Sequence, residues 1–131
     1  MNQNNSRGFT LIEFLVALVI LTVGLLGLLQ TVNYAIETNM TTQLRDEAVR
    51  LADERMSTEK AKVFDAISTN TRQEFVSVKV VNAFKNYSIV KNTTALTASG
   101  NTRNINIQVS WKHKGARYTH VISSLVSKSV Q

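Results

Sequence analysis

The pattern of apolar and polar positions changes sharply at two points along the chain. From Phe9 to Leu29 nearly every residue is apolar, and Glu13 is the only charged one. A helix of that length, at about 1.5 Å per residue, spans about 30 Å, the thickness of a bilayer's hydrocarbon core. Over 31–62 the apolar residues recur every three to five positions. This spacing predicts an amphipathic continuation of the helix, with one apolar stripe made of Leu44, Ala48, Leu51, Ala52, Met56 and Val63.

The remaining residues, 63–131, have the pattern of β-strands. Stretches 75–81, 87–91, 104–111 and 117–126 are rich in β-branched and aromatic residues. Strict alternation over 104–111 predicts a shared buried face of Ile105, Ile107, Val109 and Trp111. The polar stretches 66–72, 92–102 and 112–116 are expected to be loops or turns. The prediction is an α+β fold in which a long N-terminal helix packs on a small antiparallel sheet of about four strands.

Composition narrows the possible chemistry. The chain has no Cys, which excludes disulfides and Cys-based metal sites, and it has no Pro. Its net charge is +6, and residues 63–131 carry nine Lys and Arg against Asp65 and Glu74 alone. The sheet region is therefore basic, which favours either a polyanionic partner or simple solubility.

The sequence contains no recognisable catalytic arrangement. His113 and His120 are the only histidines and have no Cys partners, so we expect surface or turn histidines rather than a metal site. Asp65 and Glu74 are not spaced as an acid–base pair. Because phosphate-binding loops and nucleophile motifs are also missing, neither an enzyme nor a cofactor is predicted.

The stretch Gly8-Phe9-Thr10-Leu11-Ile12-Glu13, followed by the apolar run, resembles the type IV prepilin signature. The resemblance implies that residues 1–8 are a leader, cut between Gly8 and Phe9 by a prepilin peptidase that also methylates the new amino terminus of Phe9. It implies a role for Glu13 in assembly, where its carboxylate pairs with the amino group of Phe9, on a neighbouring subunit or its own, and sets the register. The implied segments are 9–30, the membrane-spanning and filament-core helix; 31–62, its amphipathic continuation; and 63–131, the sheet headpiece.

The tract from Gly24 to Leu28, Gly-Leu-Leu-Gly-Leu, is most similar to the PilV group of minor pilins. That resemblance implies a structural subunit of the initiating or tip complex of a type IV pilus. Its N-terminus is expected in the cytoplasm and its headpiece in the periplasm, until it leaves the inner membrane for a pilus on the cell surface. Gly24 and Gly27 are expected either to let the helix unwind in the filament or to assist helix packing.

Two other interpretations remain open at this point. A type II secretion pseudopilin shares the same N-terminal signature, and a DNA-uptake pseudopilin would use the basic headpiece to contact DNA. The expected partners are other pilin subunits, the prepilin peptidase, the inner-membrane assembly platform and, before assembly, membrane lipid. DNA is the less favoured partner, and its contact surface would combine the headpiece bases with nearby aromatic residues, Phe84, Tyr87, Trp111 and Tyr118.

Overall fold

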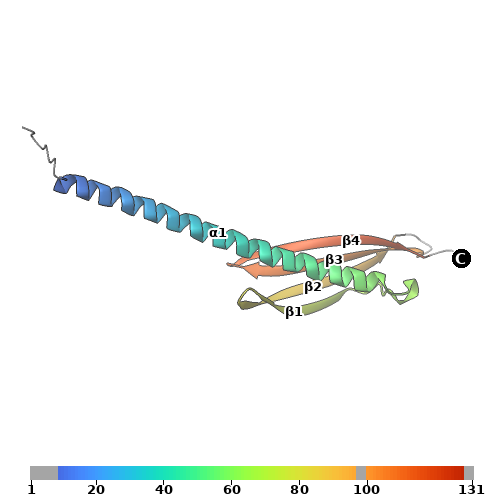
Figure 1. The fold of residues 1–131 in the computed structure, drawn as a ribbon. Helices are drawn as coiled ribbons and strands as arrows, with labels where there is room; N and C mark the ends of the chain where they lie inside the picture. The colour runs from blue at the N-terminus through green and yellow to red at the C-terminus, as the bar shows by residue number, and fades with distance from the viewer. Residues whose placement is uncertain (1–8, 97–99, 129–131) are drawn as a thin grey trace, which may run out of the picture. The chain divides into compact units, whose positions relative to one another are not determined.

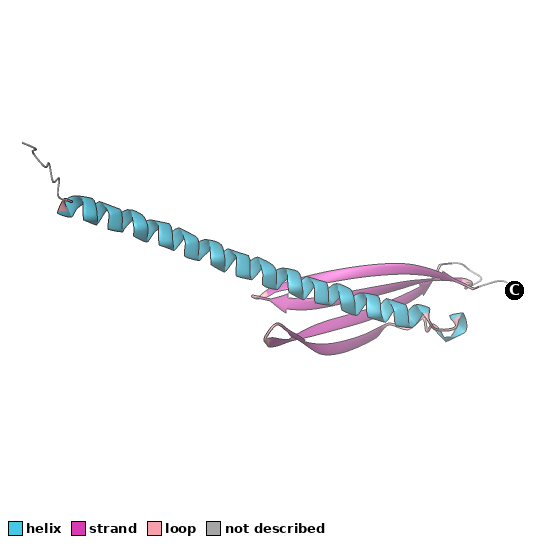
Figure 2. Cartoon of the chain, viewed as in Figure 1, coloured by secondary structure: helices cyan, strands magenta, loops and turns pink. Residues whose placement is uncertain are grey.

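The structure, a computed structural model, describes residues 9–96 and 100–128. The chain divides into two compact units, with unit 1 ending at Asn39 and unit 2 beginning at Met40. One helix contributes residues to both units, and all the strands belong to unit 2 (Figures 1 and 2). In chain order the elements are α1 (Leu11–Lys60), η1 (Phe64–Ala66), β1 (Arg72–Val80), β2 (Ala83–Ala95), β3 (Thr102–His113) and β4 (Ala116–Ser127).

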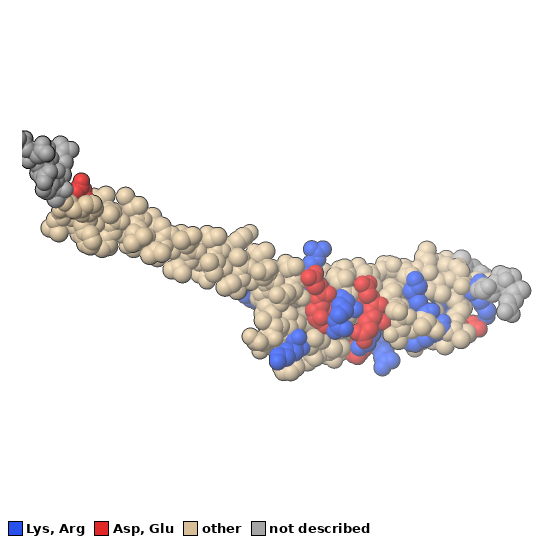
Figure 3. Space-filling model, in the orientation of Figure 1, with Lys and Arg blue, Asp and Glu red and all other residues tan. Residues whose placement is uncertain are grey.

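Unit 1 is the apolar half of α1, and its side chains have no protein cover. Every residue from Phe9 to Asn39 is exposed, and no charged residue occurs from 14 to 36 (Figure 3). By length and composition, α1 contains a stretch long and apolar enough to cross a membrane. The three threonines within this half of the helix donate their hydroxyls to carbonyls four residues earlier, which satisfies these polar groups inside the helix (Thr22, Thr31 and Thr38).

The sheet of unit 2 is a four-stranded antiparallel meander in the order β1-β2-β3-β4. It confirms the predicted sheet and the α+β fold class. Strand β2 is longer than predicted, because residues 92–95, expected to lie in a loop, pair with 103–106 of β3. Thr93 in this extension is only 2% exposed. Its β-branched side chain therefore belongs to the buried face of the sheet. The polar residues around it had indicated a loop.

The core of unit 2 lies between the C-terminal half of α1 and one face of the sheet. The predicted helix stripe is confirmed for Leu44, Ala48, Leu51, Ala52 and Met56, and the predicted buried face of β3 is confirmed for Ile105, Ile107, Val109 and Trp111. The prediction that Val63 belongs to this stripe is wrong, because its side chain is 75% exposed. Because α1 ends at Lys60, Val63 lies outside the helix and its side chain leaves the stripe.

Polar contacts fasten α1, and the segment around η1 that follows it, to the sheet at the two ends of the interface. At one end the buried Tyr87 hydroxyl donates to the Leu44 carbonyl at 3.1 Å. At the other end the Arg103 guanidinium lies 4.3 Å from the centroid of the Phe64 ring and donates to the carbonyls of Phe64 and Ile67. Between them Glu59 accepts hydrogen bonds from Lys62 (2.6 Å) and Lys91 (3.2 Å). The Glu59 and Lys91 side chains are 14% and 12% exposed, so this pair is shielded from water.

Replacing Glu59 by Gln is expected to lower the free energy of unfolding by about 2 kcal/mol near neutral pH, because the shielded Lys91 ammonium loses its carboxylate. Burial disfavours the charged form of Glu59, but hydrogen bonds and charges from Lys62 and Lys91 outweigh burial and lower its pKa. A lowered pKa stabilises the fold above the unfolded value of about 4.3, and this stability disappears as the pH falls through the folded pKa. The variant should therefore lose less stability on acidification than the parent chain.

The measurement is chemical unfolding of the full chain in detergent micelles at about pH 7 and about pH 3. The matched control is Glu54→Gln, since Glu54 pairs with Arg50 and Arg55 at the surface and is 49% exposed. We expect this control to change stability by less than about 1 kcal/mol. Equal effects of the two substitutions would contradict the importance of burial at Glu59.

Candidate processing and assembly site

The site predicted from the prepilin signature lies at the first turn of α1. The backbone N–H of Phe14 donates to the carbonyl of Thr10 at 3.2 Å, the first hydrogen bond of the helical ladder. Thr10 is therefore the N-cap residue, and Glu13 occupies the third helical position. This arrangement places the only charged side chain of the apolar run beside backbone N–H groups that have no partner within the helix.

Thr10 and Glu13 bind each other reciprocally. The Thr10 N–H donates to Glu13 Oε2 at 2.8 Å, the Thr10 hydroxyl donates to the same oxygen at 3.0 Å, and the Glu13 N–H donates to Thr10 Oγ1 at 3.3 Å. This is a capping box, which satisfies two otherwise free N–H groups and stabilises the first turn of the helix. Among the described residues no group donates to the second oxygen, Oε1. Within the described part of the chain, the carboxylate is thus oriented through Oε2 alone.

The structure brings Phe9, Thr10 and Glu13 together in one turn, and Phe9 is 76% exposed. Gly8, the other residue of the predicted cleavage site, lies outside the described residues. In the uncut chain the Phe9 nitrogen is part of a peptide bond, so the positive charge predicted to pair with Glu13 forms only after cleavage. The pairing itself stays a prediction.

Sequence reasoning missed the role of Thr10. Its signal was present, since Ser or Thr followed three residues later by Glu at the start of an apolar run is the pattern of a capping box. The prepilin resemblance explains Glu13 by a contact with the amino group of Phe9 and therefore does not point to Thr10. The geometry shows that one oxygen of the carboxylate contacts Thr10 within the chain.

Gly24 and Gly27 lie within the uninterrupted helix α1. A Cβ added at either position would meet no atom within 4 Å, so the single chain has no steric need for glycine there. The Gly27 carbonyl accepts a hydrogen bond from the Thr31 hydroxyl at 3.0 Å. Flexibility at these glycines remains a prediction, as does close approach of another helix.

The two histidines flank the turn between β3 and β4. His120 lies within the predicted strand 117–126, whereas His113 is the last residue of β3 rather than part of the turn, and both are half-buried rather than at the surface. Their Nε2 atoms are buried, and neither has a hydrogen-bond partner in the described part of the chain. In the same part no group of three His, Cys, Asp or Glu side chains is placed to hold a metal ion.

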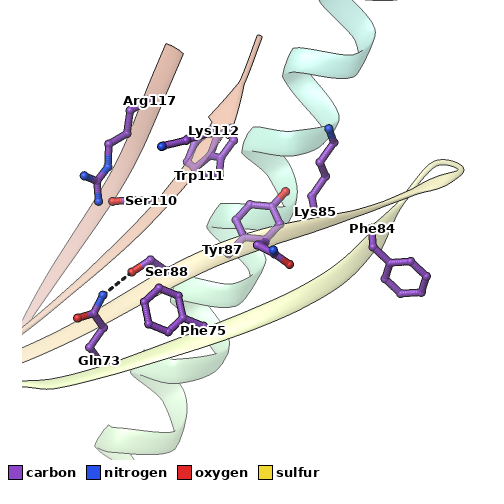
Figure 4. Close-up of a pocket in the computed structure, with 11 residues that line it drawn as sticks. Gln73, Phe75, Phe84, Lys85, Tyr87, Ser88, Ser110, Trp111, Lys112 and Arg117 are labelled. Carbon is purple, nitrogen blue, oxygen red and sulfur yellow. Dashed lines mark hydrogen bonds between the residues drawn. The ribbon is translucent and has the colours of Figure 1, made fainter. Parts of the chain in front are cut away.

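A groove of about 640 Å³ crosses the sheet face opposite α1, near the turns that join β1 to β2 and β3 to β4 (Figure 4). Phe75 and Phe84 are 74% and 72% exposed, and the described strands β2, β3 and β4 contain no acidic residue.

The prediction of an aromatic surface for DNA is partly wrong. Tyr87 and Trp111 are buried against α1, and burial together with the Glu47 charge raises the pKa of Tyr87 to about 12. The basic residues lining the groove are Lys85, Lys112 and Arg117.

Comparison with known proteins locates one match, at the N-terminus. Residues 3–29 match the prokaryotic N-terminal methylation motif, which covers the predicted cleavage site, the capping box and the apolar run. No curated protein and no solved structure matches the chain.

The motif has direct consequences for processing and location. It is typical of type IV pilins and pseudopilins, and it implies cleavage by a prepilin peptidase and assembly with other pilin-type subunits. Together with the exposed apolar helix, it indicates residence in the inner membrane followed by a filament. The chain is therefore a pilin-like structural protein rather than an enzyme, with the N-terminal methylation motif of type IV pilins and pseudopilins on a pilin-like α+β fold.

Proposed function

We propose that this protein is a minor type IV pilin of the PilV kind, which assembles into the initiating or tip complex of the pilus. In this proposal residues 1–8 are removed, the new N-terminal Phe9 is methylated, and the apolar half of α1 passes from the inner membrane into the filament core. The headpiece stays outside the core, first in the periplasm and then on the cell surface.

The observation that carries the proposal is the orientation of Glu13 at the start of an uncovered apolar helix. A carboxylate in an apolar environment is costly unless a charged partner and hydrogen bonds compensate it. The capping box supplies hydrogen bonds to Oε2, and we expect a cation to compensate the charge of the carboxylate in the filament core. The ammonium of a cleaved Phe9 on a neighbouring subunit meets this requirement only when the two helices are correctly offset. Glu13 therefore acts as a register device.

Assignment to minor rather than major pilins rests on the sequence of the apolar helix. The tract from Gly24 to Leu28 supports the PilV kind, and the chain lacks the Pro and the Cys pair that many major pilins carry. Gly24 and Gly27 are then the positions at which the helix unwinds or packs closely in the filament, since Gly weakens a helix by about 1 kcal/mol relative to Ala.

Mass spectrometry of filaments sheared from the cell surface tests this function. A peptide that begins at N-methylated Phe9 is the expected result, since it requires both processing and incorporation. Cleaved chain found only in membranes would favour a type II secretion pseudopilin instead. A chain that still begins at Met1 in assembling cells would contradict the proposal.

A DNA-uptake pseudopilin is the second candidate, and the groove on the sheet favours it. Lys112 and Arg117 lie at the groove on the face opposite α1, and the exposed Phe75 and Phe84 rings offer surfaces on which bases could stack. Retardation of single-stranded DNA by the full chain in detergent, with a steep dependence on salt concentration, is the result that this function requires. Binding that is unchanged by Phe84→Ala and Lys112→Ala together would contradict it.

A further inference from the structure

The hydrogen bonds at the ends of the strands show which backbone groups of the two edge strands point away from the sheet. The Lys128 N–H donates to the Asn101 carbonyl, and the Leu96 N–H donates to the Thr102 carbonyl. Bonded and non-bonded pairs alternate along an antiparallel ladder, and the pairing runs without a bulge through all four strands. The N–H and C=O groups that point away from the sheet therefore belong to the odd-numbered residues of its two edge strands: 117, 119, 121, 123, 125 and 127 of β4, and 73, 75, 77 and 79 of β1.

These two edges are open and differ in charge. All of those odd-numbered residues are exposed. On β4 no residue from Thr119 to Ser127 is Asp, Glu, Lys or Arg. Two exposed apolar side chains, Val121 and Leu125, lie on the face of β4 opposite α1. Long, regular and uncharged edges readily pair with another strand, and proteins usually protect them with charges, prolines or bulges. The edge of β1 carries Lys79 and the exposed Phe75 on the same face (Figure 4 shows Phe75).

The direction of α1 within unit 2 decides how two copies can meet. Leu44 contacts Tyr87 near the start of β2, and Glu59 contacts Lys91 further along it, so the helix runs in the direction of β2 and β4. Antiparallel pairing of β4 with β4 of a second copy would make the two helices run in opposite directions. In the proposed function every copy enters the membrane with the same topology, so we consider copies whose helices run in the same direction within unit 2.

Copies that stand side by side in the same orientation place different edges together. In a four-stranded meander the two outer strands run in opposite directions. Strand β4 of one copy therefore lies antiparallel to β1 of the next, with both helices on the same side of a continuous sheet. This contact is heterologous, so it leaves the other edge of each copy open and repeats along a row.

We propose that β4 is a strand-pairing surface that binds the β1 edge of a second copy of this chain, so that neighbouring headpieces share one sheet. The inference rests on the membrane orientation in the proposed function. In the register that we propose, Phe75 of the second copy faces Leu125 and its Lys79 faces Val121. An aromatic residue then packs on an apolar one, and Lys79 is kept away from Arg117. The same register places Arg72 of the second copy opposite Lys128, where Asp65 pairs with Lys128 at 3.1 Å and offsets the two like charges. In this register Ser77 of the second copy faces Ser123.

Cysteine crosslinking tests this pairing directly, because the natural chain contains no Cys. The full-length double variant Ser77→Cys/Ser123→Cys, expressed in assembling cells and mildly oxidised, is expected to give dimers and longer ladders. Each single variant should give none. Dimers of Ser123→Cys alone would instead show two β4 edges together and would overturn the proposal. Crosslinking of Ser77→Cys to Thr119→Cys in place of Ser123→Cys would overturn the register.

The matched control is Ser77→Cys/Asn106→Cys, since Asn106 lies on the same sheet face but on the inner strand β3. A ladder with this control would show random collision and overturn the proposal. The N-terminal mass of the chain is measured in the same samples. Correct cleavage without a ladder refutes the strand pairing alone, whereas an uncleaved chain refutes the proposed function.

Discussion

Replacing Glu13 by Ala is expected to leave cleavage and methylation intact and to reduce incorporation into filaments at least about tenfold. Removal of the carboxylate leaves the Phe9 ammonium of the neighbouring subunit without a partner in an apolar environment, which opposes packing of the helix into the filament core. The measurement is the ratio of sheared to membrane-bound protein, determined by quantitative immunoblotting, with the parent chain expressed at the same level. Equal incorporation would contradict the register role of Glu13.

Glu13→Gln separates the charge from the helix cap. Glutamine at the third helical position preserves a capping box, whereas it cannot pair with an ammonium as a charge. If the carboxylate acts through Phe9 of a neighbour, Gln should assemble as poorly as Ala. Thr10→Ala gives the converse change, since it removes the hydroxyl but keeps the charge and is expected to have the smaller effect. Normal assembly of the Gln variant would assign the residue to capping alone.

Replacing Gly8 by Leu is expected to block cleavage and to leave the full-length precursor in the inner membrane. A peptidase must draw the backbone on both sides of the cut into its site, and a large side chain immediately before Phe9 obstructs that approach. The measurement is the mass of the N-terminal peptide from isolated membranes. Without cleavage no Phe9 ammonium forms, so filament incorporation should disappear together with processing.

Ser6→Leu is the matched control, because it places the same side chain two residues further from the cut. This variant should be processed far better than Gly8→Leu. Normal cleavage of Gly8→Leu would contradict the assignment of the Gly8–Phe9 bond as the processing site, while blocked cleavage of both variants would show a general requirement for a polar leader.

The N-terminal part of this protein could be predicted from local sequence because its chemistry is local. A run of apolar residues long enough to cross a bilayer predicts a helix. A single carboxylate within that run indicates a functional residue, because a charge in an apolar environment is costly. The helix stripe from Leu44 to Met56 and the alternation of Ile105, Ile107 and Val109 likewise specify buried faces through their periodicity alone. These features predict the fold class and the position of Glu13, whereas the capping role of Thr10 was recognised only in the structure.

Features that depend on pairing between distant segments came only from the tertiary structure. Residues 92–95 extend β2 because β3 lies beside them, and Val63 is exposed because α1 ends at Lys60. The burial of Tyr87 against α1 and the position of β4 at an edge of the sheet also depend on which strands are neighbours. A period of two shows that alternate residues share a face, but only the arrangement of the whole sheet decides which face α1 covers and which strands are left at the edge.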